Sequence, residues 1–190
     1  MLLWLKEIDN YKSLEHYTKY ETLKPIRDEN WKVHYDNYSI ELIETNKNKS
    51  ISALIIPLHK KAIIGIKTNS LPNTNIAKKI LKNTSFQIDL KDIKIAKNVF
   101  LSIVDNSKDI IQVKFETDEP LVEEIEITGY DLNRSDLSQE MRDSPKINSI
   151  IFILKEFPQY AITLTNYGKI SIIPDPDPKD EESIIKILFR

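Results

Sequence analysis

The chain has 190 residues and a formal net charge of −2, with 41% of its residues hydrophobic and 29% charged. This composition is typical of a folded globular protein and argues against the disordered, collagen-like and coiled-coil classes. The sequence contains no cysteine, which excludes thiol catalysis, disulfides and thiolate zinc sites. The apolar run at residues 1–5 is too short for a signal peptide or a membrane span, so we expect a cytoplasmic protein.

Charge is distributed unevenly along the chain. Residues 1–100 hold 17 Lys and Arg against 11 Asp and Glu, whereas residues 101–190 hold 10 against 18. Residues 45–88 contain eight lysines and no acidic residue. This basic segment is typical either of a surface that meets phosphates or an acidic partner, or of a solvated lysine-rich face. It holds no arginine, the residue best suited to bidentate phosphate contacts, which favours the solvated face.

In the first half, side-chain periodicity predicts a helix, two hairpins and a second helix. Residues 10–26 carry apolar and aromatic side chains near helical spacing, and Pro25 ends the run. Alternating or β-branched runs predict four strands, over residues 31–35, 38–42, 51–57 and 62–66. Residues 73–75 can cap a helix over residues 76–82.

The second half repeats this order of elements. We predict strands over residues 92–104, 110–115, 122–128, 147–154, 161–165 and 170–173. Residues 131–135 lead into a predicted short helix that ends near Arg142, and a closing amphipathic helix is predicted over residues 181–189. Placing Leu54 over Thr163, at an offset of 109 positions, aligns Lys60 with Lys169. We therefore expect a duplication, with a first repeat at residues 1–88 and an acidic second repeat at residues 89–190 that has an insertion near residues 105–128.

The hairpin of residues 52–67 resembles the signature hairpin of the TATA-box-binding protein family. That hairpin has an apolar strand, a Ser-Gly-Lys turn and a second apolar strand followed by Gly and Lys, and Lys60, Gly65 and Lys67 stand in register with it. The turn at residues 168–169 and the closing helix are similar to the same pattern. The resemblance implies an α+β saddle of two pseudo-repeated units of curved antiparallel sheet, with helices on one face. In that family the concave underside binds the minor groove of double-stranded DNA.

The sequence departs from the family at the positions that kink DNA. The family inserts pairs of Phe between base steps, and Ile56 and Thr165 stand at the corresponding hairpin positions. His59 replaces the glycine of the first turn, and Asn98 matches a central asparagine of the family only after a shift of one residue.

Strand alternation predicts a different character for the two hairpins. In the first hairpin it groups four residues on one apolar face, namely Leu54, Ile56, Ala62 and Ile64, and the face behind them is also apolar. In the second hairpin, the face that holds Thr163 and Thr165 is largely polar. We therefore expect the first hairpin to leave an apolar surface uncovered, and the chain to contact its partner from one side.

Chemical motifs are few. The three histidines have no zinc-binding spacing, and a nuclease-like set of Asp89, Asp92 and Lys94 has no upstream carboxylate at a characteristic spacing. Tyrosines and tryptophans near the start alternate with lysines, a pattern that can stack single-stranded bases but is more typical of a core.

We expect a non-enzymatic, transcription-related or regulatory binding factor, without metal or cofactor, that contacts nucleic acid mainly through its first half. The alternative is a protein–protein interaction module on the same fold that does not bind DNA. The predicted contact residues are Leu54, Ile56, Lys60, Lys61, Ala62, Ile64, Lys67, Asn98, Thr163, Thr165, Lys169 and Ile173.

Overall fold

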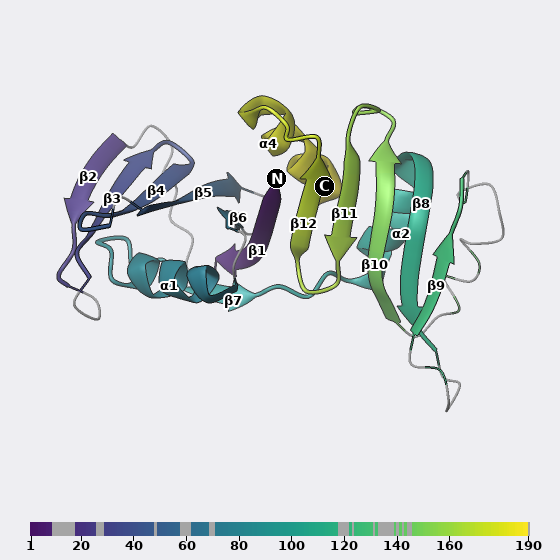
Figure 1. Ribbon diagram of the computed structural model, residues 1–190, viewed down its shortest axis with the longest axis horizontal. Helices are drawn as coiled ribbons and strands as arrows, with labels where there is room; N and C mark the ends of the chain where they lie inside the picture. Colours follow the sequence, from purple (N-terminus) through teal and green to yellow (C-terminus); the bar gives the residue numbers. More distant parts are fainter. Residues whose placement is uncertain are drawn as a thin grey trace. The chain divides into compact units, whose positions relative to one another are not determined.

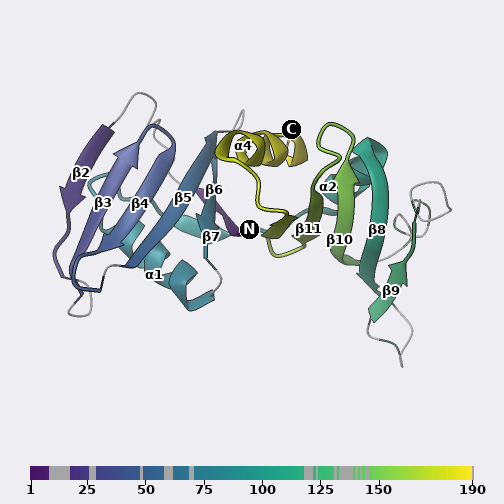
Figure 2. The same cartoon turned by 45° about the horizontal axis from the view of Figure 1, so that its top comes forward.

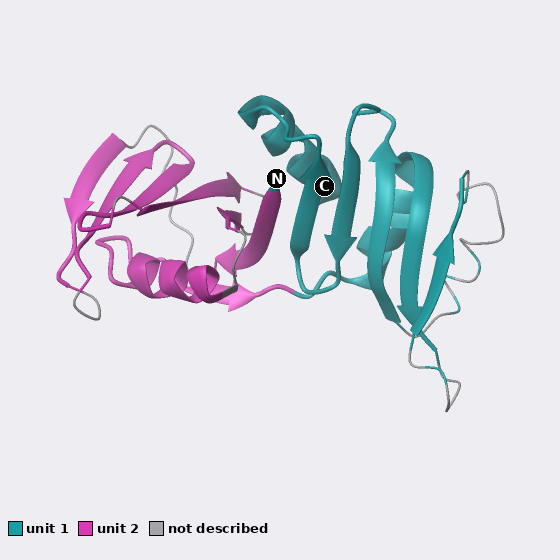
Figure 3. Ribbon diagram, viewed as in Figure 1, with its two compact units in different colours: residues 1, 94–190 teal, residues 2–93 magenta. Residues whose placement is uncertain are grey.

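A computed structural model describes residues 1–8, 18–25, 29–47, 49–57, 62–68, 71–117, 122, 124–130, 132, 139, 141, 143 and 146–189. The chain divides into two compact units (Figure 3). We call residues 2–93 the N-terminal unit and residues 94–190, together with Met1, the C-terminal unit. No described helix is both long and apolar enough to cross a bilayer.

The N-terminal unit is an antiparallel sheet with one helix, α1 (Leu71–Lys82). Its strands are β1 (Leu2–Ile8), β2 (Thr18–Thr22), β3 (Trp31–Asp36), β4 (Ser39–Glu44), β5 (Lys49–Pro57), β6 (Ala62–Lys67) and β7 (Leu90–Asp92). The strand order is β2-β3-β4-β5-β6-β1-β7 (Figure 1).

One face of this sheet and α1 form a hydrophobic core. Alternate residues of β3, such as Trp31, Val33 and Tyr35, are buried there together with Ala77 and Ile80 of α1. The residues between them point to the opposite face, which we call the outer face. Each isoleucine or leucine buried in such a core contributes about 1.5–3 kcal/mol, so the helix-covered face fixes the register of the strands.

The C-terminal unit consists of antiparallel strands and two described helices. Its elements are α2 (Lys97–Asn106), β8 (Ser107–Glu116), β9 (Glu124–Thr128), β10 (Lys146–Leu154), β11 (Ala161–Thr165), β12 (Lys169–Ile173) and α4 (Pro178–Leu188). The strand order is β12-β11-β10-β8-β9. Helix α2 lies against β8 and β10 (Figure 2), where Phe100 and Ile103 are buried.

The structure confirms an α+β fold built on antiparallel sheet, and most predicted strands and helices are present. Two of the predicted elements are wrong. Residues 92–104, expected as a strand, contain the end of β7 and most of α2, because Phe100, Ile103 and Val104 follow helical rather than strand spacing. Part of the expected helix at residues 10–26 is strand β2 instead.

Other sequence expectations meet the structure only in part. Residues 10–17 and 26 of the first predicted helix lie outside the described residues, as does most of the short helix predicted to end near Arg142. Residues 73–75 lie inside α1 rather than capping it. The two units divide after Ile93, because β7 pairs with β1 and so belongs to the N-terminal unit. A duplication of one repeat stays a prediction.

The registers of the two hairpins differ from the ungapped alignment. Leu54 pairs with Gly65 in the first hairpin, and Thr163 pairs with Ser171 in the second. At an offset of 109, Ser171 would stand over Ala62 rather than Gly65, so the second hairpin has a connection three residues shorter. Any correspondence between the hairpins therefore needs a gap in the turn.

The expected apolar face of the first hairpin, with Leu54, Ile56, Ala62 and Ile64 on one side, is wrong because of the register of β5 and β6. Ile56 pairs with Ile63 across the hairpin, and Ile55 pairs with Ile64. Cross-strand partners share a face, so Ile64 points toward α1 while Ile56 points the other way. Ala62 likewise lies on the α1 face, and Leu54 lies on the outer face.

Candidate nucleic-acid interface

The outer face of strands β2 to β4 carries exposed polar and aromatic side chains. Tyr20 and Thr22 of β2 lie opposite His34 and Lys32 of β3, and all four point away from α1. This pattern follows from alternation, because the residues between them, such as Val33, are buried against the helix. The surface is therefore a sheet face that the unit's own helix leaves uncovered.

Tyr20 and His34 form a stacked pair on this surface. Their ring centroids are 4.1 Å apart and their planes differ by 4°. Tyr20 is 69% exposed, whereas His34 is half-buried. Cross-strand pairs of this kind contribute about 0.2–1 kcal/mol, so the pair stabilises the edge of the sheet and also holds the tyrosine ring in one orientation.

A hydrogen-bonded carboxylate fixes strand β2 from the other side. Glu21 follows Tyr20 and points toward the helix side of the sheet, where its oxygens accept hydrogen bonds from the Ser85 backbone N–H at 2.8 Å and from the Ser85 hydroxyl at 3.0 Å. Ser85 lies just beyond the end of α1. These bonds connect β2 to the segment that follows α1. The strand that carries Tyr20 is therefore fixed by these bonds as well as by its pairing with β3.

The outer face carries charges of both signs. Lys32 and Lys67 supply positive charge, and Asp36 and Glu41 supply negative charge. Lys32 lies two residues from His34 on the same face, whereas Glu41 is the cross-strand partner of His34. The phosphate backbone of a nucleic acid would therefore be attracted only weakly to this face. Base stacking would have to contribute most of the binding free energy.

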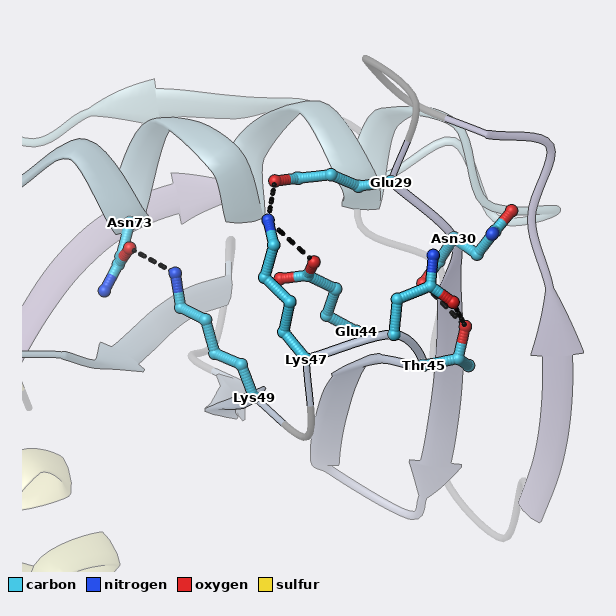
Figure 4. Close-up of polar contacts among 8 residues, drawn as sticks. Glu29, Asn30, Glu44, Thr45, Lys47, Lys49 and Asn73 are labelled. Carbon is cyan, nitrogen blue, oxygen red and sulfur yellow. Dashed lines mark hydrogen bonds and ion pairs between the residues drawn. The ribbon is translucent and has the colours of Figure 1, made fainter.

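Two lysines at the start of the basic segment at residues 45–88 contact neighbouring polar groups (Figure 4). Lys47 makes ion pairs of 3.1 Å with both Glu29 and the buried Glu44. The hydrogen bond from Lys47 lowers the pKa of Glu29, and the hydrogen bonds to Glu44 and Glu29 raise the pKa of Lys47. Lys49 donates a 3.0 Å hydrogen bond to Asn73. At these two positions the contacts favour partnered lysines over a phosphate-binding stripe.

The structure contradicts the expected exposure of the first hairpin. Ile56, Ala62 and Ile64 are 0% exposed, and Leu54 is half-buried. Lys67 is half-buried at the end of β6, and Lys60 and Lys61 lie outside the described residues. The described part of this hairpin therefore presents no continuous apolar surface. The reason is that both faces consist of apolar side chains, and a folded chain covers such faces.

The predicted contact residues of the second half lie in different environments. Asn98 is an exposed residue in the first turn of α2, not part of a central strand. Thr165 is 8% exposed, and its hydroxyl accepts a 3.0 Å hydrogen bond from the Lys169 backbone N–H, so it stabilises the turn. Thr163 is half-buried, and Ile173 is 64% exposed. The polar face predicted for this hairpin is confirmed at Thr163 and Ser171, but not at Thr165.

No three His, Asp or Glu side chains of the described residues gather closely enough to hold a metal ion. The nuclease-like carboxylates face cations instead. Asp92 accepts a 2.7 Å hydrogen bond from Lys6, and Asp89 lies 3.9 Å from the Lys82 ammonium.

The stacked pair was not predicted from the sequence, because Tyr20 was placed on a helix. The alternation of Thr18, Tyr20 and Thr22 with charged residues is a strand signal that could have indicated it. Among the other aromatic residues of the first half, Trp31 and Tyr35 belong to the core, as the sequence suggested.

No protein-family pattern matches this chain, and no characterised protein matches its sequence.

Proposed function

We propose that this protein is a non-enzymatic binding protein whose N-terminal unit binds single-stranded nucleic acid on its outer face. The observation that carries the proposal is the exposed Tyr20 ring, held parallel to His34 on an uncovered sheet face. A base can stack on the solvent side of such a ring without sequence preference, and each stacked base contributes about 1–3 kcal/mol. A transcription-related or regulatory role is the context we expect for this activity.

The geometry favours a single strand over the minor groove of a duplex. Kinking a duplex requires exposed apolar wedges, and Ile56 is fully buried. A single strand needs only a ring to stack on and a few cations along its backbone. The protein-interaction alternative required an exposed apolar hairpin face, and no observation on the described residues now favours it.

The proposal is tested by titrating the full chain into a fluorescein-labelled ten-residue oligothymidine. Tyr20→Ala should weaken binding about tenfold or more, because one stacked base is lost. Tyr130, which is 91% exposed in the C-terminal unit, provides the matched control, and Tyr130→Ala should leave the affinity unchanged. Equal affinities for wild type and Tyr20→Ala, or tighter binding of the matching duplex, would overturn the proposal.

The salt dependence gives a second test. If Lys32 and Lys67 each meet one phosphate, the logarithm of the affinity should fall with the logarithm of the salt concentration with a slope of about −1.4. Lys32→Gln should halve that slope. A slope several times steeper would mean that a basic stripe elsewhere in the chain binds the strand.

A further inference from the structure

Strand β2 is the first strand in the sheet order of the N-terminal unit (Figure 1). It pairs with β3 on one side, and no strand of the described residues pairs with its other side. A strand in this position has a row of backbone N–H and C=O groups that can pair with another chain. The outer side of β2 is therefore an edge at which a further strand can add to the sheet.

The hydrogen bonds of the β2–β3 ladder show which backbone groups lie on this edge. The N–H of Leu23 donates to the carbonyl of Trp31 at 3.0 Å, so these two residues are a hydrogen-bonded pair in the register of β2 and β3. Hydrogen-bonded and non-hydrogen-bonded pairs alternate along an antiparallel ladder, so Lys19 and Glu21 direct their backbone groups toward β3. The residues that direct their backbone groups to the edge are Thr18, Tyr20 and Thr22.

The two charged side chains of β2 lie on the α1 side of the strand, one residue before and one residue after Tyr20. The Ser85 hydroxyl accepts a 3.4 Å hydrogen bond from the Lys19 ammonium and donates a 3.0 Å hydrogen bond to the Glu21 carboxylate. Both side chains are half-buried. An ammonium and a carboxylate have more hydrogen-bonding sites than these contacts use, so each can take a further partner.

The sequence of β2 is complementary to itself when it is read in the opposite direction. The strand reads Thr-Lys-Tyr-Glu-Thr. In an antiparallel pair of two such strands with Tyr20 opposite Tyr20, Lys19 is opposite Glu21 on both sides of the two-fold axis, and Thr18 is opposite Thr22. Opposite charges, aromatic pairs and threonine pairs are all favourable across antiparallel strands.

Only this register satisfies both the backbone and the charges. It places the outward-pointing backbone groups of the two strands opposite each other, as hydrogen-bonded pairs require. A shift by one residue would place outward-pointing groups opposite inward-pointing ones. A shift by two residues would place Lys19 opposite Lys19 or Glu21 opposite Glu21, and like charges directly opposite each other are destabilising.

Strand β9, which ends the strand order of the C-terminal unit, lacks this self-complementarity. It reads Glu-Ile-Glu-Ile-Thr. The N–H of Gly129 donates to the carbonyl of Ile111 at 3.0 Å, so by the same alternation Glu126 directs its backbone groups away from β8. A two-fold pair centred on β9 would place Glu126 opposite Glu126, which charge repulsion disfavours.

We propose that β2 is a dimerisation edge at which a second copy of this chain adds its own β2, antiparallel and with Tyr20 opposite Tyr20. The interface is isologous, because the same strand contributes from both copies. Cross-strand partners share a face of the sheet, so the Tyr20–His34 stacks of the two copies lie on the same side of the joined sheet. The dimer can form whether or not the outer face binds nucleic acid.

The test is sedimentation velocity of the full chain from about 10 µM to about 1 mM, because a contact of one short strand gives modest affinity. The wild type should shift toward twice the monomer mass as its concentration rises. Lys19→Glu should weaken dimerisation about tenfold or more, because it replaces both ion pairs with like-charge pairs. Lys79→Glu makes the same charge change at an exposed position of α1 and should have no effect. A wild type that stays monomeric at every concentration, or equal weakening by the two variants, would overturn the proposal.

Mixing two variants tests the register directly. Glu21→Lys alone should weaken dimerisation as Lys19→Glu does, but an equimolar mixture of the two variants should recover dimers. In the mixed dimer, each acidic side chain of the first variant is opposite a lysine of the second. A mixture that stays monomeric contradicts the proposed register.

A backbone variant covers the case in which Glu21→Lys fails to fold, since that change also removes the hydrogen bonds to Ser85. Thr22→Pro removes one outward-pointing N–H and leaves both charges and the β2–β3 hydrogen bonds in place. It should weaken dimerisation about tenfold, because a hydrogen bond across the two-fold axis is lost and a carbonyl of the other copy stays unpaired. Dimerisation of Thr22→Pro at the wild-type affinity would show that this edge is not the interface.

Discussion

Lys6 of β1 and Asp92 of β7 are directly opposite each other in the antiparallel ladder, and the Lys6 ammonium donates a 2.7 Å hydrogen bond to the Asp92 carboxylate. The hydrogen bond and the charge of Lys6 lower the pKa of Asp92. The side chain of Lys6 is 13% exposed and that of Asp92 is 84% exposed. This pair helps to hold the short strand β7 in the N-terminal unit.

Lys6→Gln should therefore lower stability in a pH-dependent way. A carboxyl group with a lowered pKa contributes stability that is present above its unfolded pKa, near 3.8, and is lost as the pH falls through the folded value. The difference in melting temperature between wild type and Lys6→Gln should be constant from about pH 5 to pH 7 and shrink below about pH 4.

Thermal melts at pH 7, 5, 3 and 2 measure this difference, and an NMR titration of Asp92 should show its pKa rising in the variant. Lys24→Gln, an exposed position in the same unit, controls for the change in net charge. A difference that persists unchanged at pH 2 would mean that the packing of the Lys6 stem, rather than its charge, stabilises the strand.

The success of the sequence predictions depended on how strongly each segment alternates. Residues 162–165 alternate Ile, Thr, Leu and Thr, and this pattern predicted the buried and polar sides of β11 except at Thr165. Residues 62–66 read Ala, Ile, Ile, Gly and Ile, which are apolar at every position. Such a run carries no information on which residues face the helix, and the connection between the strands decides the register instead.

Features built from distant segments could not be predicted in the same way. A pocket in the C-terminal unit combines residues near positions 94–100, 146–147 and 166–167, which no local sequence pattern brings together. Helix α2 was missed because its β-branched residues indicate a strand, although Phe100, Ile103 and Val104 already follow helical spacing. Tertiary packing decided in favour of the helix.

Ile56→Asp should unfold or strongly destabilise the protein. Ile56 is 0% exposed, so the variant loses a buried side chain and buries a carboxylate without a partner. We expect a loss of about 3 kcal/mol or more in the free energy of unfolding. Ile173→Asp makes the same change at a position that is 64% exposed and should stay within about 0.5 kcal/mol of wild type. Urea denaturation measures both, and a stable Ile56→Asp variant would show that this residue is accessible.

Thr165→Val should destabilise the C-terminal unit. The substitution keeps the side-chain volume but removes the hydroxyl that accepts the Lys169 N–H, and Thr165 is only 8% exposed. We expect a loss of about 1–2 kcal/mol in the free energy of unfolding. Thr163→Val, on the polar side of the same strand, should change it by less than about 0.5 kcal/mol. Equal effects in urea denaturation would mean that the hydroxyl bond does not stabilise the turn.

Asp177 caps helix α4, and its loss should destabilise that helix. Its carboxylate accepts the backbone N–H groups of Lys179 and Asp180 at 3.0 and 2.8 Å. Asp177→Ala leaves both donors without this partner and should cost about 1 kcal/mol in the free energy of unfolding, whereas Asp177→Asn keeps an acceptor oxygen and should cost only a few tenths. Hydrogen exchange of the first-turn amides locates the effect. Because the cap is local, protection in α2 should stay at its wild-type level; if α2 loses protection equally, the cap supports the whole unit rather than one helix.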